Sequence, residues 1–284
     1  KKGGNAFDAM VATSFALTVV FPNAGNITGG GFMVYRTSNG EIGSLDYRET
    51  APLSSSENMY LDKNGEVVKD LSRIGGLAVG VPGSVAGILE VHKKMGSLPL
   101  ADLIQPSIEL ANYGFIVTEK QSKSLNSKRE EFIKVNGENT FYGKSFKKGD
   151  LIKNPNLAKA LNEILRYGSN GFYEGWVAES MVKKVNKTGG KMLLKDLKSY
   201  EPKWRKPIVF DYKDLKIISM GPPSSGGICL AQMMKMIEPF DIGKFGYKSH
   251  NALHLMIEAE RRSYADRSYF LGDPDFVSVP KYHL

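Results

Sequence analysis

Two serines lie in a turn rich in proline and glycine, where residue types and spacing are suited to chemistry. The turn reads Met220-Gly221-Pro222-Pro223-Ser224-Ser225-Gly226-Gly227, and it joins a predicted strand at residues 215–220 to a predicted helix at residues 228–236. Such junctions bind anions or hold nucleophiles in many α/β enzymes, because hydroxyls and free amides gather there. The serines can instead cap the helix, and no obvious base is tied to them in the sequence. The pattern favours a structural role and leaves a nucleophilic one open.

A second candidate site is the charged segment Asp46-Tyr47-Arg48-Glu49, which follows a predicted strand and a glycine-rich loop. The planar guanidinium of arginine can bind a carboxylate through two parallel hydrogen bonds. Arg48 is therefore a candidate for binding a carboxylate ligand. The alternative is a surface ion pair of Arg48 with Asp46 or Glu49, which stabilises a protein very little. The residues alone leave both interpretations open.

Other motifs give weaker signals. Gly29-Gly30-Gly31 precedes a strand instead of following one, so it is not a dinucleotide fingerprint. His250 and His254 have the spacing of a metal-binding pair, but the flanking glutamate of the zinc-protease motif is absent. Cys229 lies in an apolar helix and is expected in the core. We expect neither a cofactor nor a metal.

The elements that position these residues alternate between hairpins and long helices. Ser38-Asn39-Gly40 predicts a turn between strands at residues 32–35 and 42–47, and a second hairpin is predicted at residues 208–212 and 215–220. Helices are predicted at residues 5–20, 84–94, 100–112, 118–135, 155–167, 174–186, 196–200, 228–237 and 250–270. No interdomain linker is evident, so residues 1–284 are expected to form a single domain segment. The pattern predicts a layered α+β fold with a mainly antiparallel sheet.

Composition excludes several classes of protein. The 284 residues carry a net charge of +8, but aromatic residues do not interleave with the lysines, so no nucleic-acid partner is expected. The most apolar stretch, residues 10–21, is too short to span a membrane. A single cysteine rules out a disulfide framework.

Six segments, taken in order, closely resemble the large subunit of γ-glutamyltranspeptidases. Each motif alone is weak, but their order makes the resemblance specific, and it extends from Gly3 to about Pro280. The segments are Gly3-Gly4-Asn5-Ala6-Phe7-Asp8-Ala9, Gly25-Asn26-Ile27-Thr28-Gly29-Gly30-Gly31-Phe32, Asp46-Tyr47-Arg48-Glu49, Pro82-Gly83-Ser84-Val85-Ala86-Gly87, Pro222-Pro223-Ser224-Ser225-Gly226-Gly227 and Tyr264-Ala265-Asp266-Arg267-Ser268.

The resemblance implies an N-terminal-nucleophile hydrolase with a four-layer αββα sandwich, incomplete in this chain. It implies a precursor that cleaves itself into two subunits, with the N-terminal threonine of the small subunit as nucleophile. The γ-glutamyl group of glutathione or a related amide passes to that threonine, and then to water, an amino acid or a peptide. The family's arginine that grips the substrate α-carboxylate corresponds to Arg48, and Tyr47 replaces the usual phenylalanine. The serines then become structural.

The resemblance also sets expectations for what surrounds the chain. We expect the N-terminal part, the tail of the large subunit and the catalytic small subunit to lie outside it, so that no catalytic residue is in this chain and the fragment alone is inactive. The expected location is periplasmic or secreted. Thr28 stands where relatives usually have glycine. A poly-γ-glutamate capsule transpeptidase or a cephalosporin acylase of the same fold is the alternative, and a non-enzymatic binding module is a second one.

Overall fold

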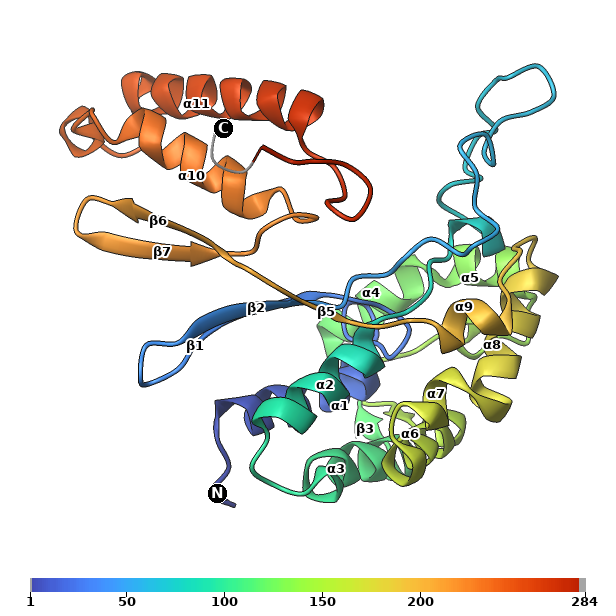
Figure 1. Ribbon diagram of the computed structural model, residues 1–284. Helices are drawn as coiled ribbons and strands as arrows, with labels where there is room; N and C mark the ends of the chain where they lie inside the picture. The colour runs from blue at the N-terminus through green and yellow to red at the C-terminus, as the bar shows by residue number, and fades with distance from the viewer. Residues whose placement is uncertain (1, 281–284) are drawn as a thin grey trace. The chain divides into compact units, whose positions relative to one another are not determined.

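A computed structural model describes residues 2–280 of the chain (Figure 1). The chain is mixed α+β, as predicted, and divides into two compact units. Unit 1 comprises residues 2–31 and 47–202, and unit 2 comprises residues 32–46 and 203–280. Whether residues 1–284 behave as a single domain segment stays a prediction, and each unit is described by itself.

Unit 1 is mainly helical. α1 packs against α2 and α3, α3 packs against α6, and α7 links α6 to α8. Its helices are α1 (Ala6–Val20), η1 (Gly76–Ala78), α2 (Ser84–Met95), α3 (Leu100–Tyr113), α4 (Glu119–Ser127), α5 (Arg129–Asn136), η2 (Phe141–Gly143), α6 (Pro155–Tyr167), α7 (Asn170–Tyr173), α8 (Gly175–Lys187) and α9 (Leu194–Lys198). A two-stranded antiparallel sheet pairs β3 (Phe115–Ile116) with β4 (Leu151–Ile152).

α1 contributes one face to the core of unit 1. Val11 and Phe15 are fully buried, whereas Leu17 is 38% exposed. The structure therefore buries one side of this helix. The helix begins with a capping box, in which the Asn5 side chain accepts from the amides of Phe7 and Asp8.

Asp8 ties the start of α1 to the loop after α2. Its carboxylate accepts hydrogen bonds from the amides of Asn5, Ser97 and Leu98 at 2.8–3.2 Å, and from the Ser97 hydroxyl. Burial by itself raises the pKa of Asp8, but these hydrogen bonds, that of the Ser97 side chain first, outweigh it and hold the pKa well below its usual range.

The Asp8→Asn variant tests this tie. Because the pKa is depressed in the folded state, the ionised carboxylate stabilises the fold above the ordinary aspartate pKa of about 4, and this contribution is lost as the pH falls. We expect the variant to melt several degrees below the parent protein at pH 7. The difference should shrink when both are compared below about pH 4 by thermal unfolding monitored with circular dichroism. An equal difference at both pH values would contradict the assignment.

Unit 2 contains a three-stranded antiparallel sheet with the order β1-β2-β5. β1 (Phe32–Arg36) and β2 (Ile42–Asp46) form the predicted hairpin, with Phe32 opposite Asp46. β5 (Lys203–Arg205) pairs with the end of β2, so that Asp46 lies opposite Lys203. The sequence did not predict β5, because three residues, one tryptophan between two cations, are too few to show a strand pattern.

The second predicted hairpin of unit 2 supports two helices. β6 (Ile208–Tyr212) pairs with β7 (Leu215–Ser219), and α10 (Gly226–Ile237) packs against both strands. α11 (His250–Phe270) lies alongside α10 (Figure 1). A short 3-10 helix, η3 (Ile242–Phe245), connects them. The proline- and glycine-rich turn is therefore the predicted strand-to-helix corner.

The single helix predicted at residues 118–135 is wrong: the structure has α4 and α5, separated at Lys128. The last turn of α4 is rich in side chains that compete with the helix for backbone groups. The Ser127 hydroxyl donates to the Ser124 carbonyl, and Asn126 bonds the backbone of Phe146. These contacts compete with continuation of the helix near Lys128.

None of the helices within residues 2–280 has the length and apolar character needed to cross a membrane.

Candidate functional site

Three backbone segments meet around Arg48 in unit 1. They are residues 29–31 of the glycine-rich loop, residues 47–50 and residues 80–84, and we call their meeting point the Arg48 junction. Three of the six motifs, far apart in the sequence, thus contribute to one place.

Main-chain hydrogen bonds close the Arg48 junction. Gly31 and Tyr47 exchange two bonds of 3.0 and 3.2 Å, and Thr50 and Val81 exchange two of 2.8 and 3.2 Å. The Gly29 carbonyl accepts from the amides of Gly83 and Ser84 at 2.8 and 2.9 Å, which satisfies two donors at the start of α2. Each of the three segments is thereby bonded directly to both of the others.

Glycine is required where these segments approach one another. A Cβ at Gly30 would lie 2.6 Å from Glu49 Oε2 and 2.7 Å from the Tyr47 carbonyl oxygen. A Cβ at Gly83 would lie 2.1 Å from both the Tyr47 carbonyl oxygen and the Tyr200 hydroxyl. No side chain fits at such distances, so the glycines are needed for space.

Arg48 itself is exposed on unit 1, and its carbonyl oxygen accepts a 2.8 Å hydrogen bond from the Tyr200 hydroxyl. Sequence reasoning missed Tyr200, because a lone tyrosine after a short helix gives no functional signal. The Tyr200 ring stacks on that of Tyr173 at 5.9 Å with an interplanar angle of 3°. The Tyr173 hydroxyl donates to the Pro82 carbonyl at 2.8 Å. The tyrosine pair therefore joins residues 47–50 to residues 80–84.

Tyr173 and Tyr47, which both lie at the Arg48 junction, are neutral at physiological pH. Burial raises the pKa of Tyr173 strongly, and the hydrogen bond from the Ala86 amide lowers it only in part. Burial likewise raises the pKa of Tyr47. The junction therefore gains no negative charge from these phenols that would compete with an anionic ligand for Arg48.

Asp46, the first residue of the charged motif, belongs to an ion network within unit 2. Arg205 Nε lies 2.8 Å from Asp46 Oδ2, and its two terminal nitrogens bond Asp275 at 2.8 and 3.1 Å. Lys203 Nζ lies 2.7 Å from Asp275. Hydrogen bonds from Arg205 and then Lys203 hold the pKa of Asp275 well below its usual range. Asp46 therefore has Arg205 as an ion-pair partner within unit 2, and a surface pair of Arg48 with Asp46 or Glu49 stays an open alternative.

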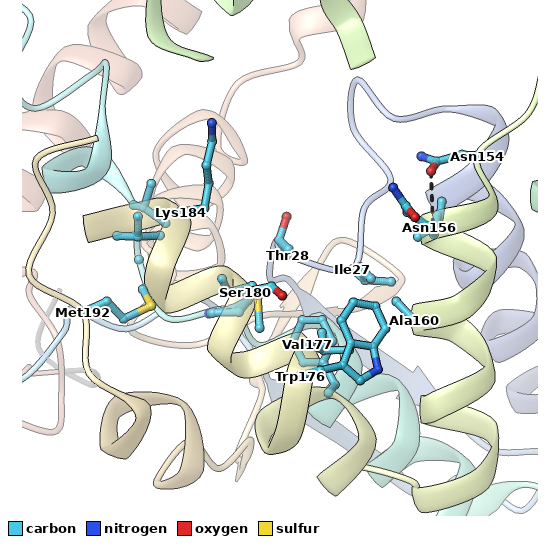
Figure 2. A pocket seen from close by; sticks show the side chains of 17 residues that line it. Ile27, Thr28, Asn154, Asn156, Ala160, Trp176, Val177, Ser180, Lys184 and Met192 are labelled. Carbon is cyan, nitrogen blue, oxygen red and sulfur yellow. Dashed lines mark hydrogen bonds between the residues drawn. The ribbon is translucent and has the colours of Figure 1, made fainter. Parts of the chain in front are cut away.

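A pocket of about 490 Å³ borders the glycine-rich loop on unit 1 (Figure 2). Figure 2 shows Ile27 and Thr28 facing it between Lys184 on one side and Asn154 and Asn156 on the other. The Thr28 hydroxyl donates to Asn26 Oδ1 at 3.0 Å. The rest of the lining is largely apolar: Val79, Gly80, Pro82, Leu157, Ala160, Phe172, Trp176, Val177, Ser180, Met181, Val185 and Met192. Arg48 does not line this pocket, so the cavity and the candidate carboxylate site are distinct features.

The serine candidates have structural partners in unit 2. Ser224 Oγ accepts from the Gly226 amide at 3.2 Å, and Ser225 Oγ accepts from Arg267 Nε at 2.9 Å. The predicted side-chain cap is not made: Ser225 is the N-cap residue of α10 and its side chain does not cap the helix, whereas Ser224 bonds only the amide of the first helical residue. Ser225 instead joins the corner to α11. An amide and a guanidinium cannot remove a proton from a hydroxyl. The motif containing Arg267 thus packs on the serine motif.

The histidine pair has no metal-binding surroundings in the part of the chain that the structure describes, where no three acidic, histidine or cysteine side chains gather. Cys229 is buried, as predicted.

Comparison with known proteins agrees with the motif order. The family model described as Gamma-glutamyltranspeptidase matches residues 1–284. The glutathione hydrolase proenzyme of Escherichia coli is 43% identical over 285 residues, covering 99% of this chain and 49% of that protein. The crystal structure of Helicobacter pylori gamma-glutamyltranspeptidase superposes with a TM-score of 0.95 at 48% identity, covering 99% of this chain and 81% of that one.

A more distant likeness reaches enzymes of other specificity. The cephalosporin acylase from Bacillus halodurans superposes with a TM-score of 0.86 at 26% identity, covering 99% of this chain and 53% of that one. These likenesses confirm the predicted N-terminal-nucleophile hydrolase fold class. The chain spans about half the length of the curated relatives it matches. With the family model matching throughout, the chain belongs to the gamma-glutamyltranspeptidase family.

Proposed function

We propose that this chain is the large-subunit part of an enzyme that transfers γ-glutamyl groups from glutathione or related amides to water, amino acids or peptides. The observation that carries the proposal is the family match over residues 1–284, together with the placement of Arg48 at a rigid junction. In this reaction a threonine hydroxyl attacks the γ-carbonyl carbon, the amine leaves with a proton, and the resulting ester is cleaved by water or by an acceptor amine.

Arg48 binds the α-carboxylate of the γ-glutamyl group in this proposal. A γ-glutamyl group differs from an ordinary peptide residue because its α-carboxylate and α-amine are both free. A guanidinium fork recognises that carboxylate bidentately. The exposed side chain on a backbone held by Gly31, Val81 and Tyr200 supports this role, since a fixed base limits where the guanidinium can reach.

The nucleophilic threonine belongs, in this proposal, to a small subunit cut from the same precursor. The curated relatives are named proenzymes. One side of α11 supports association with a further chain, because four apolar side chains on it are exposed. The last three lie three, four and eleven residues after the first, a spacing that places all four on one face of a helix. They are Leu253, Met256, Ile257 and Tyr264, each more than 40% exposed. By family resemblance we place the enzyme in the periplasm or outside the cell.

Substrate comparison with the full-length protein tests the proposed function. We expect release of aniline from a γ-glutamyl anilide, and rates at least about a hundredfold lower with the matched α-glutamyl anilide, which has no free α-carboxylate. Poly-γ-glutamate and a cephalosporin are assayed beside them. If the enzyme prefers poly-γ-glutamate to the γ-glutamyl anilide, a capsule transpeptidase replaces the proposal. If it prefers the cephalosporin, a cephalosporin acylase replaces it.

A further inference from the structure

We propose that Tyr200 is a positioning residue for substrate binding, acting through the main chain of Arg48. The inference rests on the proposed role of Arg48. Tyr200 does not touch substrate in this proposal. Its hydroxyl fixes the peptide group that carries the Arg48 side chain, and so sets where the guanidinium meets the α-carboxylate.

The carbonyl of Arg48 is the middle group of the segment at residues 47–50. Main-chain bonds hold Tyr47 to Gly31 on one side and Thr50 to Val81 on the other. Between these two anchors, the Arg48 carbonyl is held at 2.8 Å by a side chain, that of Tyr200. Losing the Tyr200 hydroxyl would free the peptide plane between residues 48 and 49 to rotate while both anchors stay in place.

Tyr200 is itself held rigidly in unit 1. It lies two residues beyond α9, and its amide donates to the Leu197 carbonyl at 3.2 Å. The buried Asp196 carboxylate in α9 accepts from the amides of Leu193 and Leu53 at 2.7 and 2.9 Å. Asp196 therefore bonds α9 to Leu53, in the chain that follows Arg48. This contact restricts the position of Tyr200, which lies just beyond the helix.

The tyrosine stack sets the direction of the Tyr200 hydroxyl. Tyr173 is 5% exposed, and its own hydroxyl is occupied by the Pro82 carbonyl and the Ala86 amide. The nearly parallel Tyr200 ring rests on this immobile ring. Stacking restricts the ring plane, and the hydroxyl then points at a single carbonyl. A residue kept only for packing would not need a polar atom at that end of the ring.

The Tyr200→Phe variant of the full-length protein tests the proposal, because phenylalanine keeps the stack and removes the bond. With a γ-glutamyl anilide we expect KM to rise about three- to tenfold, the effect of one lost hydrogen bond, while kcat changes less than about twofold. With the α-methyl ester of the same donor, which offers Arg48 no carboxylate, we expect the KM to stay as in the parent. An unchanged KM for the free acid, or an equal change for both donors, would overturn the proposal.

Tyr60→Phe is the matched control for loss of a tyrosine-to-carbonyl bond. The Tyr60 hydroxyl donates to the Leu77 carbonyl at 3.1 Å, within unit 1 and outside the three segments of the Arg48 junction. We expect a small loss of melting temperature and no change of KM. If Tyr200→Phe yields no folded protein, Tyr200→His replaces it, because an imidazole keeps an aromatic ring against Tyr173 but is too short to place a donor where the phenol oxygen lies. The histidine variant should then show a raised KM for the free acid alone, and a parental KM would overturn the proposal.

The Arg48→Ala variant separates failure of this inference from failure of the proposed function. If Arg48→Ala raises KM and Tyr200→Phe does not, Tyr200 has no positioning role and the Arg48 assignment stands. If Arg48→Ala also leaves KM unchanged, the Arg48 assignment itself is wrong, and the Tyr200 proposal is overturned with it.

Discussion

Arg48→Ala in the full-length protein raises the KM for a γ-glutamyl donor about a hundredfold, with kcat changed much less. The expectation follows from the loss of a bidentate, charge-assisted contact worth about 3 kcal/mol. Arg48 contributes only its backbone carbonyl to the bond with Tyr200, and its side chain is exposed. Removal of the guanidinium therefore leaves the junction's main-chain bonds in place, so the variant should keep the circular dichroism spectrum of the parent protein.

Two further substitutions make the Arg48 measurement specific. Arg48→Lys keeps the charge but not the planar fork, so we expect a KM between those of the parent and the alanine variant. Arg73→Ala removes another exposed arginine of unit 1, which pairs with Asp70 at 3.3 Å, and we expect it to leave KM unchanged. A KM for Arg48→Ala equal to that of Arg73→Ala would sink the assignment, because both variants reduce the net positive charge equally.

Long elements with a clear period were predictable from the sequence. α6 was predicted with its observed bounds, since Asn154 caps it and Pro155 opens it. The two hairpins were predicted from turn residues and alternating strands, and both are antiparallel pairs in the structure. These features depend on local chemistry, which the sequence displays directly.

Elements that depend on a partner far along the chain were not predictable. β5 has three residues and exists because β2 lies beside it, about 160 positions earlier. The break between α4 and α5 depends partly on Phe146, whose backbone occupies the Asn126 side chain. In each case the deciding contact is tertiary, and local propensity gives no sign of it.

The candidate site, too, was predictable from the sequence in part. Arg48 could be singled out because arginine between acidic residues at a strand end is itself a chemical signal. The Arg48 junction could not be derived, because the approach of three segments appears in the sequence only as glycines at residues 29–31, 80 and 83. Tyr200 gave no signal in the sequence for the same reason, because its hydrogen bond to the Arg48 carbonyl spans about 150 residues.

Gly83→Ala is expected to destabilise unit 1 strongly. Gly83 precedes α2 with φ −114° and ψ −15°, values that alanine adopts without strain, so any effect comes from space alone. The added Cβ would lie 2.1 Å from the Tyr47 carbonyl oxygen and 2.1 Å from the Tyr200 hydroxyl. One of these atoms belongs to backbone held by Gly31, and the other to a stacked ring, so neither can move freely. We expect a loss of about 3 kcal/mol or more in unfolding free energy.

Gly243→Ala is the matched control, because a Cβ there meets its nearest atom at an ordinary 3.6 Å, and we expect a melting temperature close to that of the parent. The double variant Gly83→Ala with Tyr200→Phe separates the two contacts. It removes the phenol oxygen but keeps the Tyr47 carbonyl and the ring carbon Cζ, which would lie 2.6 Å from the added Cβ. It should therefore recover only part of the stability lost in Gly83→Ala, measured by denaturant unfolding. Full recovery would show that the Tyr47 backbone yields, whereas a parental stability of Gly83→Ala alone would contradict the close approach on which the Arg48 junction is built.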